Sequence, residues 1–301
     1  MCANGDETRL YELPPSRFSI AEALFHETWF DAAFIGAVFE GRSPGRLFVD
    51  HVERPTAALM ARTFEYYVAG SARAEALRLF IREAPSEAQI FAELYGYAPT
   101  NIGWSLSLLS DHVGQLVVVP RRGFLWHEHD AAQAALAPWR ESAPGVTVHA
   151  IDEAMALRLE RELHEDVGHF WGGRDEFLST SFGYCTLVGD ALASIAHAIG
   201  IGSGEANIGV FTVPEFRRNG HAARACTAYI DHCLQLGLVP TWDSDSDNPR
   251  SADLARKLGF IEVPPFSQLS PRPGSKIAES SGLWTMERMT DDIKVWRRRF
   301  G

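Results

Sequence analysis

The stretch from Val213 to Ala222, VPEFRRNGHA, constrains the fold of this chain more than any other. The residues before it, Asn207 to Val213, alternate and are rich in β-branched and aromatic side chains, which predicts a strand. A loop containing Arg217-x-x-Gly220-x-Ala222 therefore joins this strand to a helix. The helix is indicated by apolar residues that recur every three or four positions, namely Ala222, Ala223, Cys226, Ile230, Cys233 and Leu234.

This loop has the properties of an anion-binding site. Gly220 and Ala222 have almost no side chain, so a ligand can approach their backbone closely. The first amides of the following helix have no partner inside the helix and point into the same space. The helix dipole adds a partial positive charge there. Together these features suit a pyrophosphate group.

A second stretch supports the same interpretation. Asn248 to Phe260, NPRSADLARKLGF, begins with a helix cap followed by proline and places Gly259 just past the helix. The two stretches, in this order, resemble the acetyl-CoA motifs of the GNAT acetyltransferase superfamily. The resemblance covers about half of the chain, from Val146 to Met289. Within the superfamily, residues 171–184 and 240–260 are most similar to the branch that contains the zwittermicin A resistance acetyltransferase.

The resemblance implies transfer of an acetyl group from acetyl-CoA to an amine by direct attack in a ternary complex. Pantetheine would lie along the backbone of the strand, where an amide polarises the thioester carbonyl. Asn248 would reach pantetheine or serve only as a helix cap, and the two roles are compatible. The expected cofactor-binding residues are Phe211, Thr212, Val213, Arg217, Arg218, Asn219, Gly220, His221, Ala222, Asn248 and Ser251.

A primary amine has a pKa of about 10.4 and arrives protonated, so the reaction needs a base or a water chain. Glu205 is the first candidate, because it shares a strand face with Phe211 and several family members have a base there. A solvated strand end is the alternative interpretation of Glu205, and Asp243 on the next strand is the second candidate base. The family often has a tyrosine as general acid where this chain has Ala255. That role then falls to Ser251, to water or to no group.

Four aromatic residues are candidates for the wall of the acceptor pocket, and core packing is the alternative for each of them. They are Trp171, Phe177, Phe182 and Tyr184. A metal site is not expected, because His127-Glu128-His129 and the pair His164 and His169 lack the His-Glu-x-x-His spacing that places two ligands on one helix face.

The totals exclude several classes of protein. The formal net charge of −11 disfavours binding to nucleic acid and is compatible with a cationic substrate such as an amine. No apolar run reaches the roughly 20 residues that span a membrane, and residues 1–7 do not resemble a signal peptide. The cytoplasm is therefore the expected location, with a small-molecule amine as partner and either a monomer or a homodimer as the assembly.

The strand and helix pattern predicts an α/β fold with a GNAT-like mixed sheet flanked by helices. Residues 1–140 are expected to form a second, degenerate GNAT-like domain without a CoA site, because no Arg-x-x-Gly-x-Ala occurs there. Residues 146–301 are expected to form the catalytic domain. In detail the pattern predicts a strand at Phe34–Phe39, a linker at Pro138–Gly145, a loop at residues 264–281 and a terminal helix at Asp291–Arg299.

Two functions remain open at this point. The first is an N-acetyltransferase that acts on a small amine, such as an antibiotic or another metabolite. The second is a CoA-binding regulatory or scaffold protein with little catalysis, which is suggested by Ala255 in place of the expected tyrosine. Release of free thiol from acetyl-CoA in the presence of amines distinguishes the two.

Overall fold

The computed structural model describes residues 9–26, 31–63, 65–82, 89–91, 116–271, 284–290 and 293–298. The chain divides into two compact units, each built from separate segments of sequence. Unit 1 contains Met1–Asp31, Gly45–Arg121 and Pro265–Gly301, and unit 2 contains Ala32–Pro44 and Arg122–Pro264. The chain therefore passes from one unit to the other several times.

Unit 1 is an antiparallel sheet except for one parallel pair, β4 with β5. The strand order is β14-β15-β1-β2-β3-β4-β5-β13, followed by the first half of β6 (Leu116–Leu125). Helix α3 (Glu75–Arg82) buries Ala76, Leu77 and Ile81 in the core of this unit. The other elements are β1 (Arg9–Leu13), β2 (Arg46–Val49), β3 (Ala57–Arg62), β4 (Glu65–Gly70), β5 (Gln89–Phe91), β13 (Phe266–Pro271), β14 (Trp284–Thr290), β15 (Ile293–Arg298), α1 (Ser19–Glu22) and the 3-10 turns Pro15–Arg17 and Ala23–Phe25.

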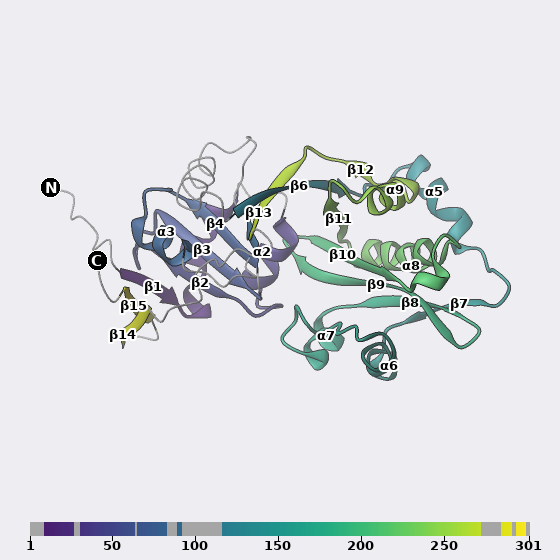
Figure 1. Ribbon diagram of the computed structural model, residues 1–301, viewed down its shortest axis with the longest axis horizontal. Coiled ribbons are helices and arrows are strands. Elements are labelled where there is room, and N and C mark those ends of the chain that lie inside the picture. The colour runs from purple at the N-terminus through teal and green to yellow at the C-terminus, as the bar shows by residue number, and fades with distance from the viewer. Residues whose placement is uncertain are drawn as a thin grey trace. The chain divides into compact units, whose positions relative to one another are not determined.

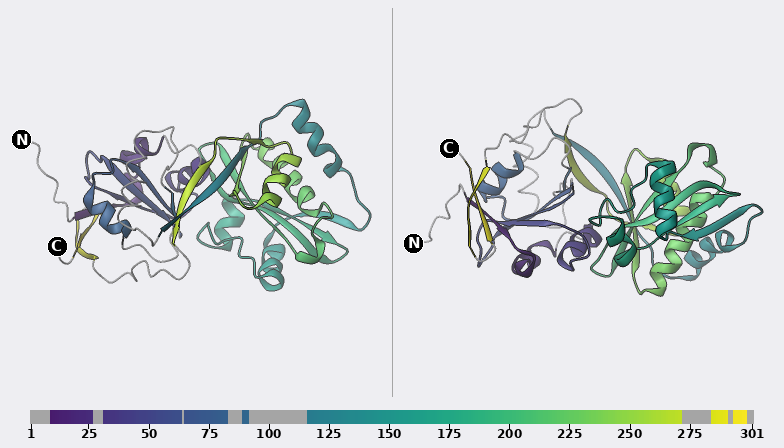
Figure 2. Two further views of the ribbon diagram at one scale, coloured as in Figure 1. Left: turned by 45° about the horizontal axis from the view of Figure 1, so that its top comes forward. Right: turned by 90° about the horizontal axis from the view of Figure 1, so that it is seen from below.

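Unit 2 contains a mixed sheet with the order β11-β10-β9-β8-β7, continued beyond β11 by the second half of β6 and by β12. Strands β10 and β11 are parallel, whereas the pairs β7–β8, β8–β9 and β9–β10 are antiparallel. Helices α8 and α9 lie on one face of the sheet, and α6 and α7 lie on the other (Figure 1, Figure 2). The elements are α2 (Ala32–Phe39), α5 (Asp130–Arg140), β7 (Val146–Ala150), α6 (Glu153–Leu163), α7 (Arg174–Thr180), β8 (Gly183–Val188), β9 (Ala191–Gly202), β10 (Glu205–Thr212), α8 (His221–Gln235), β11 (Val239–Asp245), α9 (Pro249–Lys257) and β12 (Ile261–Glu262).

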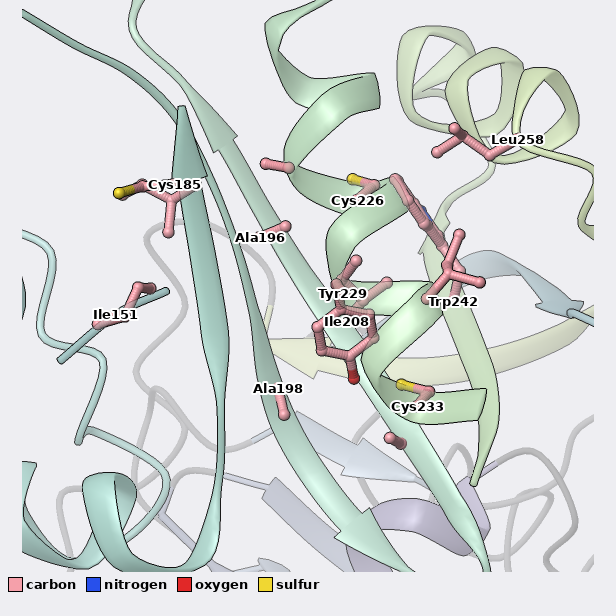
Figure 3. Close-up of a cluster of buried hydrophobic side chains, with 14 of the residues drawn as sticks. Ile151, Cys185, Ala196, Ala198, Ile208, Cys226, Tyr229, Cys233, Trp242 and Leu258 are labelled. Atoms are coloured by element: carbon pink, nitrogen blue, oxygen red, sulfur yellow. The ribbon is translucent and has the colours of Figure 1, made fainter. Parts of the chain in front are cut away.

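Helix α8 is the central helix of unit 2, and its apolar face has the spacing that the sequence predicts. Cys226, Tyr229 and Cys233 are fully buried and project from α8 into the core (Figure 3). Ala196, Ala198 and Ile208 come from β9 and β10 in the same close-up, whereas Ile151 and Cys185 lie on the other side of β8. Small side chains on β9 allow the helix to lie close to the strands.

Two helices of unit 2 begin with a side-chain cap, of which the one on α9 is predicted in the sequence analysis. The Asp152 side chain accepts a hydrogen bond from the Met155 backbone N–H at 2.8 Å, at the start of α6. The Asn248 side chain accepts one from the Ser251 N–H at 3.3 Å, at the start of α9. Both side chains satisfy an amide that the helix leaves without a partner.

Residues Phe34–Phe39 were predicted to form a strand, but in the structure they belong to helix α2. The run from Ala33 to Val38 is apolar at every position and buried throughout, and periodicity alone cannot distinguish a buried helix from a buried strand. The helix packs on β9, where a Cβ built on Gly202 would lie 2.1 Å from the Ala37 nitrogen. Polar contacts continue this packing, because the Ser203 N–H donates to Glu40 Oε1 at 2.6 Å. This N-terminal segment therefore belongs to unit 2.

Three further predictions of secondary structure were wrong. Residues 138–140, expected in a linker, are the last residues of α5, which contains Pro138. The expected terminal helix is strand β15, which pairs with β1 and β14. Strand β13 occupies part of the expected loop at 264–281, of which residues 272–281 lie outside the described part of the chain. The compact units are discontinuous in sequence, so the division at 140–146 into a degenerate and a catalytic domain stays a prediction.

Candidate functional site

A pocket of about 670 Å³ lies in unit 2, at the end of β10 and the beginning of α8. It is formed by the last residues of β10, the loop that follows, the first turn of α8, one residue of β11 and one face of α9. The lining residues are Val210, Phe211, Thr212, Phe216, Arg217, Arg218, Gly220, His221, Ala222, Ala223, Trp242, Asn248, Arg250, Ser251, Asp253, Leu254 and Lys257.

The pocket exists because two parallel strands diverge. Strands β10 and β11 are paired from Glu205 with Val239 to Asn207 with Thr241, and β10 then continues to Thr212 with β9 as its partner. The pairing of β10 with β9 shifts register between Asn207 and Ile208, which marks a bulge at the point of divergence. The β11-facing edge of β10 is thus available to an extended ligand, as in the addition of a strand to a sheet.

The beginning of α8 provides unpaired amides. The Arg217 guanidinium Nε donates to the Thr212 carbonyl at 3.2 Å and ties the loop to the strand. Gly220 has φ 80° at the N-cap, a left-handed conformation that glycine adopts without strain. In the described part of the chain, no backbone N–H of residues 218–223 donates to a backbone carbonyl. These amides and the helix dipole favour an anion at the pocket wall.

The charges of the pocket also favour an anion. Four cationic residues line it, Arg217, Arg218, Arg250 and Lys257, against one acid, Asp253. Asp253 is paired with Arg256 at 3.3 Å, whereas none of the four cations forms an ion pair within the described residues. A protein with a net charge of −11 thus concentrates unpaired positive charge at one pocket.

Trp139 is a neighbour of the pocket that the sequence analysis missed. Its indole ring lies beside Gly220, and a Cβ added to Gly220 would be 2.7 Å from the ring atom Cζ3. The Lys257 ammonium lies over the face of the same ring, with Nζ 4.3 Å from the ring centroid. Arg224 of α8 donates a hydrogen bond to the Trp139 carbonyl oxygen at 3.2 Å, which links α8 to the end of α5. Trp139 was missed because it lies in the predicted linker, directly after a proline, and proline normally interrupts a helix.

Most of the predicted cofactor residues line this pocket. Val213 and Asn219 do not, whereas the other predicted residues between Phe211 and Ala222 do, together with Asn248 and Ser251. The cationic face of α9 was not predicted from the sequence. A helical spacing of three and four places its members on one side of the helix: Arg250, Asp253, Leu254 and Lys257.

Ser251 and Ala255 have different environments on α9. Ser251 Oγ accepts a hydrogen bond from the Trp242 indole N–H at 2.9 Å, so the hydroxyl proton remains available to a second group. Ala255 is fully buried and does not line the pocket. Ser251 therefore presents a hydroxyl proton to the pocket, whereas the methyl group of Ala255 has none to donate.

The two carboxylate candidates lie outside the pocket lining, on the sheet face opposite α8. Glu205 is at the start of β10, five residues before Val210, or about 17 Å along the strand at about 3.3 Å per residue. Its burial without a paired cation raises its pKa to about 7. Asp243 lies closer to the pocket, and its Oδ2 accepts a hydrogen bond from Asn207 Nδ2 at 3.1 Å. Glu205 would thus need a relay to reach the pocket.

The four aromatic candidates do not form one wall. Trp171 and Phe177 are buried in the core on the α6 and α7 side, where the Trp171 indole N–H donates to the Ala198 carbonyl at 3.1 Å. Phe182 and Tyr184 lie on the α8 side. Phe182 stacks on His232 at 4.4 Å between centroids, and the Tyr184 hydroxyl is 2.6 Å from His232 Nδ1. The structure places all four in packing contacts, and their contact with a substrate stays a prediction.

Two other classes of site were searched for. Within the described ranges, no group of three or more His, Cys, Asp and Glu side chains could hold a metal ion. No helix in the described part of the chain is long and apolar enough to cross a membrane.

Comparison with known proteins gives the family. The model of the family described as GNAT acetyltransferase matches residues 22–269. The uncharacterized N-acetyltransferase YdfB of Bacillus subtilis (strain 168) is 23% identical over 262 residues, which are 86% of this chain and 97% of that protein. A GCN5-related N-acetyltransferase-like protein from Streptococcus suis 89/1591 has a TM-score of 0.67 at 20% identity, over 85% of this chain and 99% of that chain.

A tandem GNAT protein from the clavulanic acid biosynthesis pathway is similar across both units, with a TM-score of 0.57 at 14% identity over 90% of this chain and 97% of that chain. The predicted fold class is thereby confirmed, while the branch within the superfamily stays a prediction. The family match extends over both units and includes the strand, loop and helix that form the pocket. The chain belongs to the GNAT acetyltransferase family.

Proposed function

We propose that the protein is an N-acetyltransferase that transfers an acetyl group from acetyl-CoA to a primary amine of a small molecule. The observation that carries this proposal is the pocket itself, in which four cations without an ion pair among the described residues line the same pocket as the N-terminal amides of α8. A pyrophosphate and a further phosphate are the anions that such a set of donors suits. The family assignment and the N-acetyltransferase relative support the same activity.

The residues fit acetyl-CoA in a consistent order. The unpaired edge of β10 at Val210 to Thr212 would bind the pantetheine amides, and an N–H in this segment would polarise the thioester carbonyl. Arg217, Arg218 and the first turn of α8 would hold the pyrophosphate. When bound, acetyl-CoA supplies an activated acyl group, so the chain needs no nucleophile of its own. Ser251 would donate a proton to the leaving thiolate.

The carboxylates that would remove protons from the amine lie on the sheet face opposite α8. Glu205 has a pKa of about 7, a value suited to a general base near neutral pH. Asp243 lies between Glu205 and the pocket along this face and is fixed by Asn207. Glu205 would therefore accept the proton through Asp243 or through water.

A CoA-binding regulatory protein with little catalysis is the second candidate. It is favoured by one observation, the buried Ala255 at the position where the family often has a catalytic tyrosine. The proposal of catalysis requires that Ser251 or water replaces that group. The two candidates differ in one measurable quantity, the release of thiol from acetyl-CoA in the presence of an amine.

The test combines binding and turnover. Calorimetric titration with acetyl-CoA should give one binding event, whose affinity falls with rising salt because the contacts are ionic. Arg217→Ala should weaken binding about tenfold, the effect of losing one charge-assisted hydrogen bond. Thiol release should then require an amine. Binding without thiol release from any amine supports the regulatory function, and the absence of binding overturns both candidates.

Glu205→Gln has a stability effect whose sign follows from its pKa. A carboxyl with a pKa raised from 4.5 to about 7 contributes stability below pH 4.5 that is lost as the pH rises through 7, because the buried carboxylate is disfavoured. The neutral amide of Gln avoids that loss. We therefore expect Glu205→Gln to melt above the wild type at pH 8 and alike at pH 4. Its turnover should be lower and should lose the rise toward alkaline pH, whereas acetyl-CoA affinity stays the same.

Melting curves and pH–rate profiles of both proteins check this prediction. Equal melting temperatures at pH 8 would show that Glu205 is solvated, which was the alternative interpretation from the sequence. An unchanged pH–rate profile would assign the proton transfer to Asp243 or to water.

A further inference from the structure

Strand β7 (Val146–Ala150) is the outermost strand of the unit 2 sheet, where it pairs with β8 (Figure 1). No second strand pairs with it in the described part of the chain. Thr147 to Ala150 are all exposed, and the apolar side chain of Val148 is 41% exposed. The outer side of such a strand presents backbone N–H and C=O groups with which another strand can pair.

The hydrogen bonds at the two ends of β7 show which of its residues point outward. The Ile151 N–H donates to the Gly183 carbonyl at 2.8 Å, and the Gly189 N–H donates to the Gly145 carbonyl at 2.9 Å. The residues of each bond are directly opposite each other in the β7–β8 register, and opposite residues of an antiparallel pair are alternately bonded and not bonded. The odd-numbered residues of β7 therefore bond to β8, and the backbone groups of its even-numbered residues point to the outer edge.

Most of these outward groups have no protein partner. Among the described residues, the backbone groups of Val148 and Ala150 form no backbone hydrogen bond on this side, and neither does the Val146 carbonyl. The Val146 N–H is occupied, because it donates to the Ala143 carbonyl at 3.0 Å in the turn before the strand. The edge is thus a surface to which an extended segment can be added as a further strand.

Strand β7 also lacks the features that normally prevent edge strands from pairing, which are charged side chains, proline and bulges. Residues 142–151 contain no Asp, Glu, Lys or Arg, although 22% of the chain is charged and its net charge is −11. No proline occurs between Gly145 and Ile151, and the β7–β8 register has no shift, whereas β8–β9 and β9–β10 each have one. A second negatively charged molecule can therefore approach this edge without like charges meeting on it.

We propose that β7 pairs antiparallel with β7 of a second copy of this chain, about a two-fold axis at Val148, and that the protein forms a weak homodimer through this edge. Val148 then exchanges both of its backbone hydrogen bonds with the same residue of the second copy, and the Ala150 N–H donates to the Val146 carbonyl. An edge that pairs with itself in this way forms the self-complementary contact that two-fold symmetry requires.

The side chains of β7 match in the same arrangement. Val146 lies opposite Ala150 of the second copy on one face, and Thr147 lies opposite His149 on the other. The latter two side chains are compatible partners, because within one strand His149 Nε2 already lies 2.8 Å from Thr147 Oγ1. The inference does not depend on the proposed function, since β8 and β9 separate β7 from β10, the strand that lines the pocket.

The size of the contact sets the expected affinity. Pairing through one strand of five residues gives a small interface, and interfaces below about 1,200 Å² in total are weak. We therefore expect a Kd for the dimer of about 10–100 µM. Sedimentation of the whole protein at concentrations from about 1 to 500 µM measures this equilibrium.

Hydrogen exchange of single amides, measured by NMR, identifies the edge that pairs. The Val148 and Ala150 amides point outward and should exchange rapidly in dilute protein and slowly in concentrated protein. The Thr147 and His149 amides bond to β8 and should be protected at both concentrations. This alternation along one strand is specific for pairing at β7.

Val148→Lys should weaken the dimer at least about tenfold, because it places two ammonium groups opposite each other at the two-fold axis. The matched control is Ile261→Lys. Ile261 is 49% exposed and lies in β12, beyond β6 at the opposite end of the unit 2 sheet, so the change in charge and in exposed apolar surface is the same. This control should dimerise like the wild type. Both variants should remain folded and bind acetyl-CoA as the wild type does.

Three results would overturn the inference. The protein could sediment as a monomer at every concentration, which would leave the edge to a different protein. The Val148 and Ala150 amides could be protected independently of concentration, which would mean that a segment of the same chain covers them. A dimer that Val148→Lys does not weaken more than Ile261→Lys would use another surface.

Discussion

Ala222→Glu should abolish acetyl-CoA binding while the protein stays folded. Ala222 lines the pocket in the first turn of α8, where the amides and the dipole favour negative charge. A glutamate carboxylate would occupy that position and repel the pyrophosphate. We expect the Kd to rise more than about 100-fold, since two like charges in a partly desolvated site differ by several kcal/mol from an unopposed anion. The same carboxylate should stabilise the helix by about 0.3–1 kcal/mol.

Calorimetry and thermal unfolding check the two halves of this prediction. Ala222→Gln is the control, because it has the size of glutamate without the charge and should weaken binding less. A near-wild-type Kd for a folded Ala222→Glu protein would show that the anion does not bind at the beginning of α8. Equal losses for Glu and Gln would show that steric exclusion, and not charge, governs the position.

Gly220 is a less informative position for this experiment. Its φ of 80° is unfavourable for any other residue, and a Cβ would lie 2.7 Å from the Trp139 ring. A substitution there would strain the loop and displace Trp139 whether or not a ligand binds. Ala222 has helical geometry, so a change of its side chain tests the ligand rather than the backbone.

Most residues of the candidate pocket could be predicted from the sequence because the expected chemistry is mainly that of the backbone. Gly220 indicates a turn, Ala222 indicates that a ligand can approach the backbone closely, and Asn248 indicates a helix cap. Each of these is a local property of a few neighbouring residues. The tryptophan beside this loop could not be predicted in the same way. Trp139 is far from Gly220 in the sequence, and only the packing of α5 against α8 brings its ring to that glycine.

The fold was predictable to a similar degree. Elements with a clear period or cap, such as α8 and α9, occur where the sequence places them. The errors concern segments whose structure depends on distant partners. Ile293–Arg298, IKVWRR, has no strict alternation of charged and apolar residues, and it becomes a strand because β1 and β14 pair with it. Local pattern cannot supply such pairing.

Gly202→Val should disrupt the packing of α2 on β9. A Cβ on Gly202 would lie 2.1 Å from the Ala37 nitrogen and 2.3 Å from the Gly36 carbon, which are backbone atoms of α2. They cannot move away unless the helix moves as a whole. Gly202 does not have a positive φ and β9 is a strand, a conformation that valine favours. The cost is thus steric, and we expect about 3 kcal/mol or more of destabilisation.

Gly204→Ala separates sterics from backbone strain. Gly204 has φ 77° with nothing within 4 Å of its Cβ position, so alanine should cost only the strain of the left-handed conformation, about 1–2 kcal/mol. Because a chain of two compact units need not unfold in one step, hydrogen exchange of the peptide containing Ala32–Phe39 is the informative measurement. Gly202→Val should remove its protection, and Gly204→Ala should not. Protection that persists in Gly202→Val would mean that α2 does not pack on β9, and residues 32–44 would then no longer belong to the unit that contains the pocket.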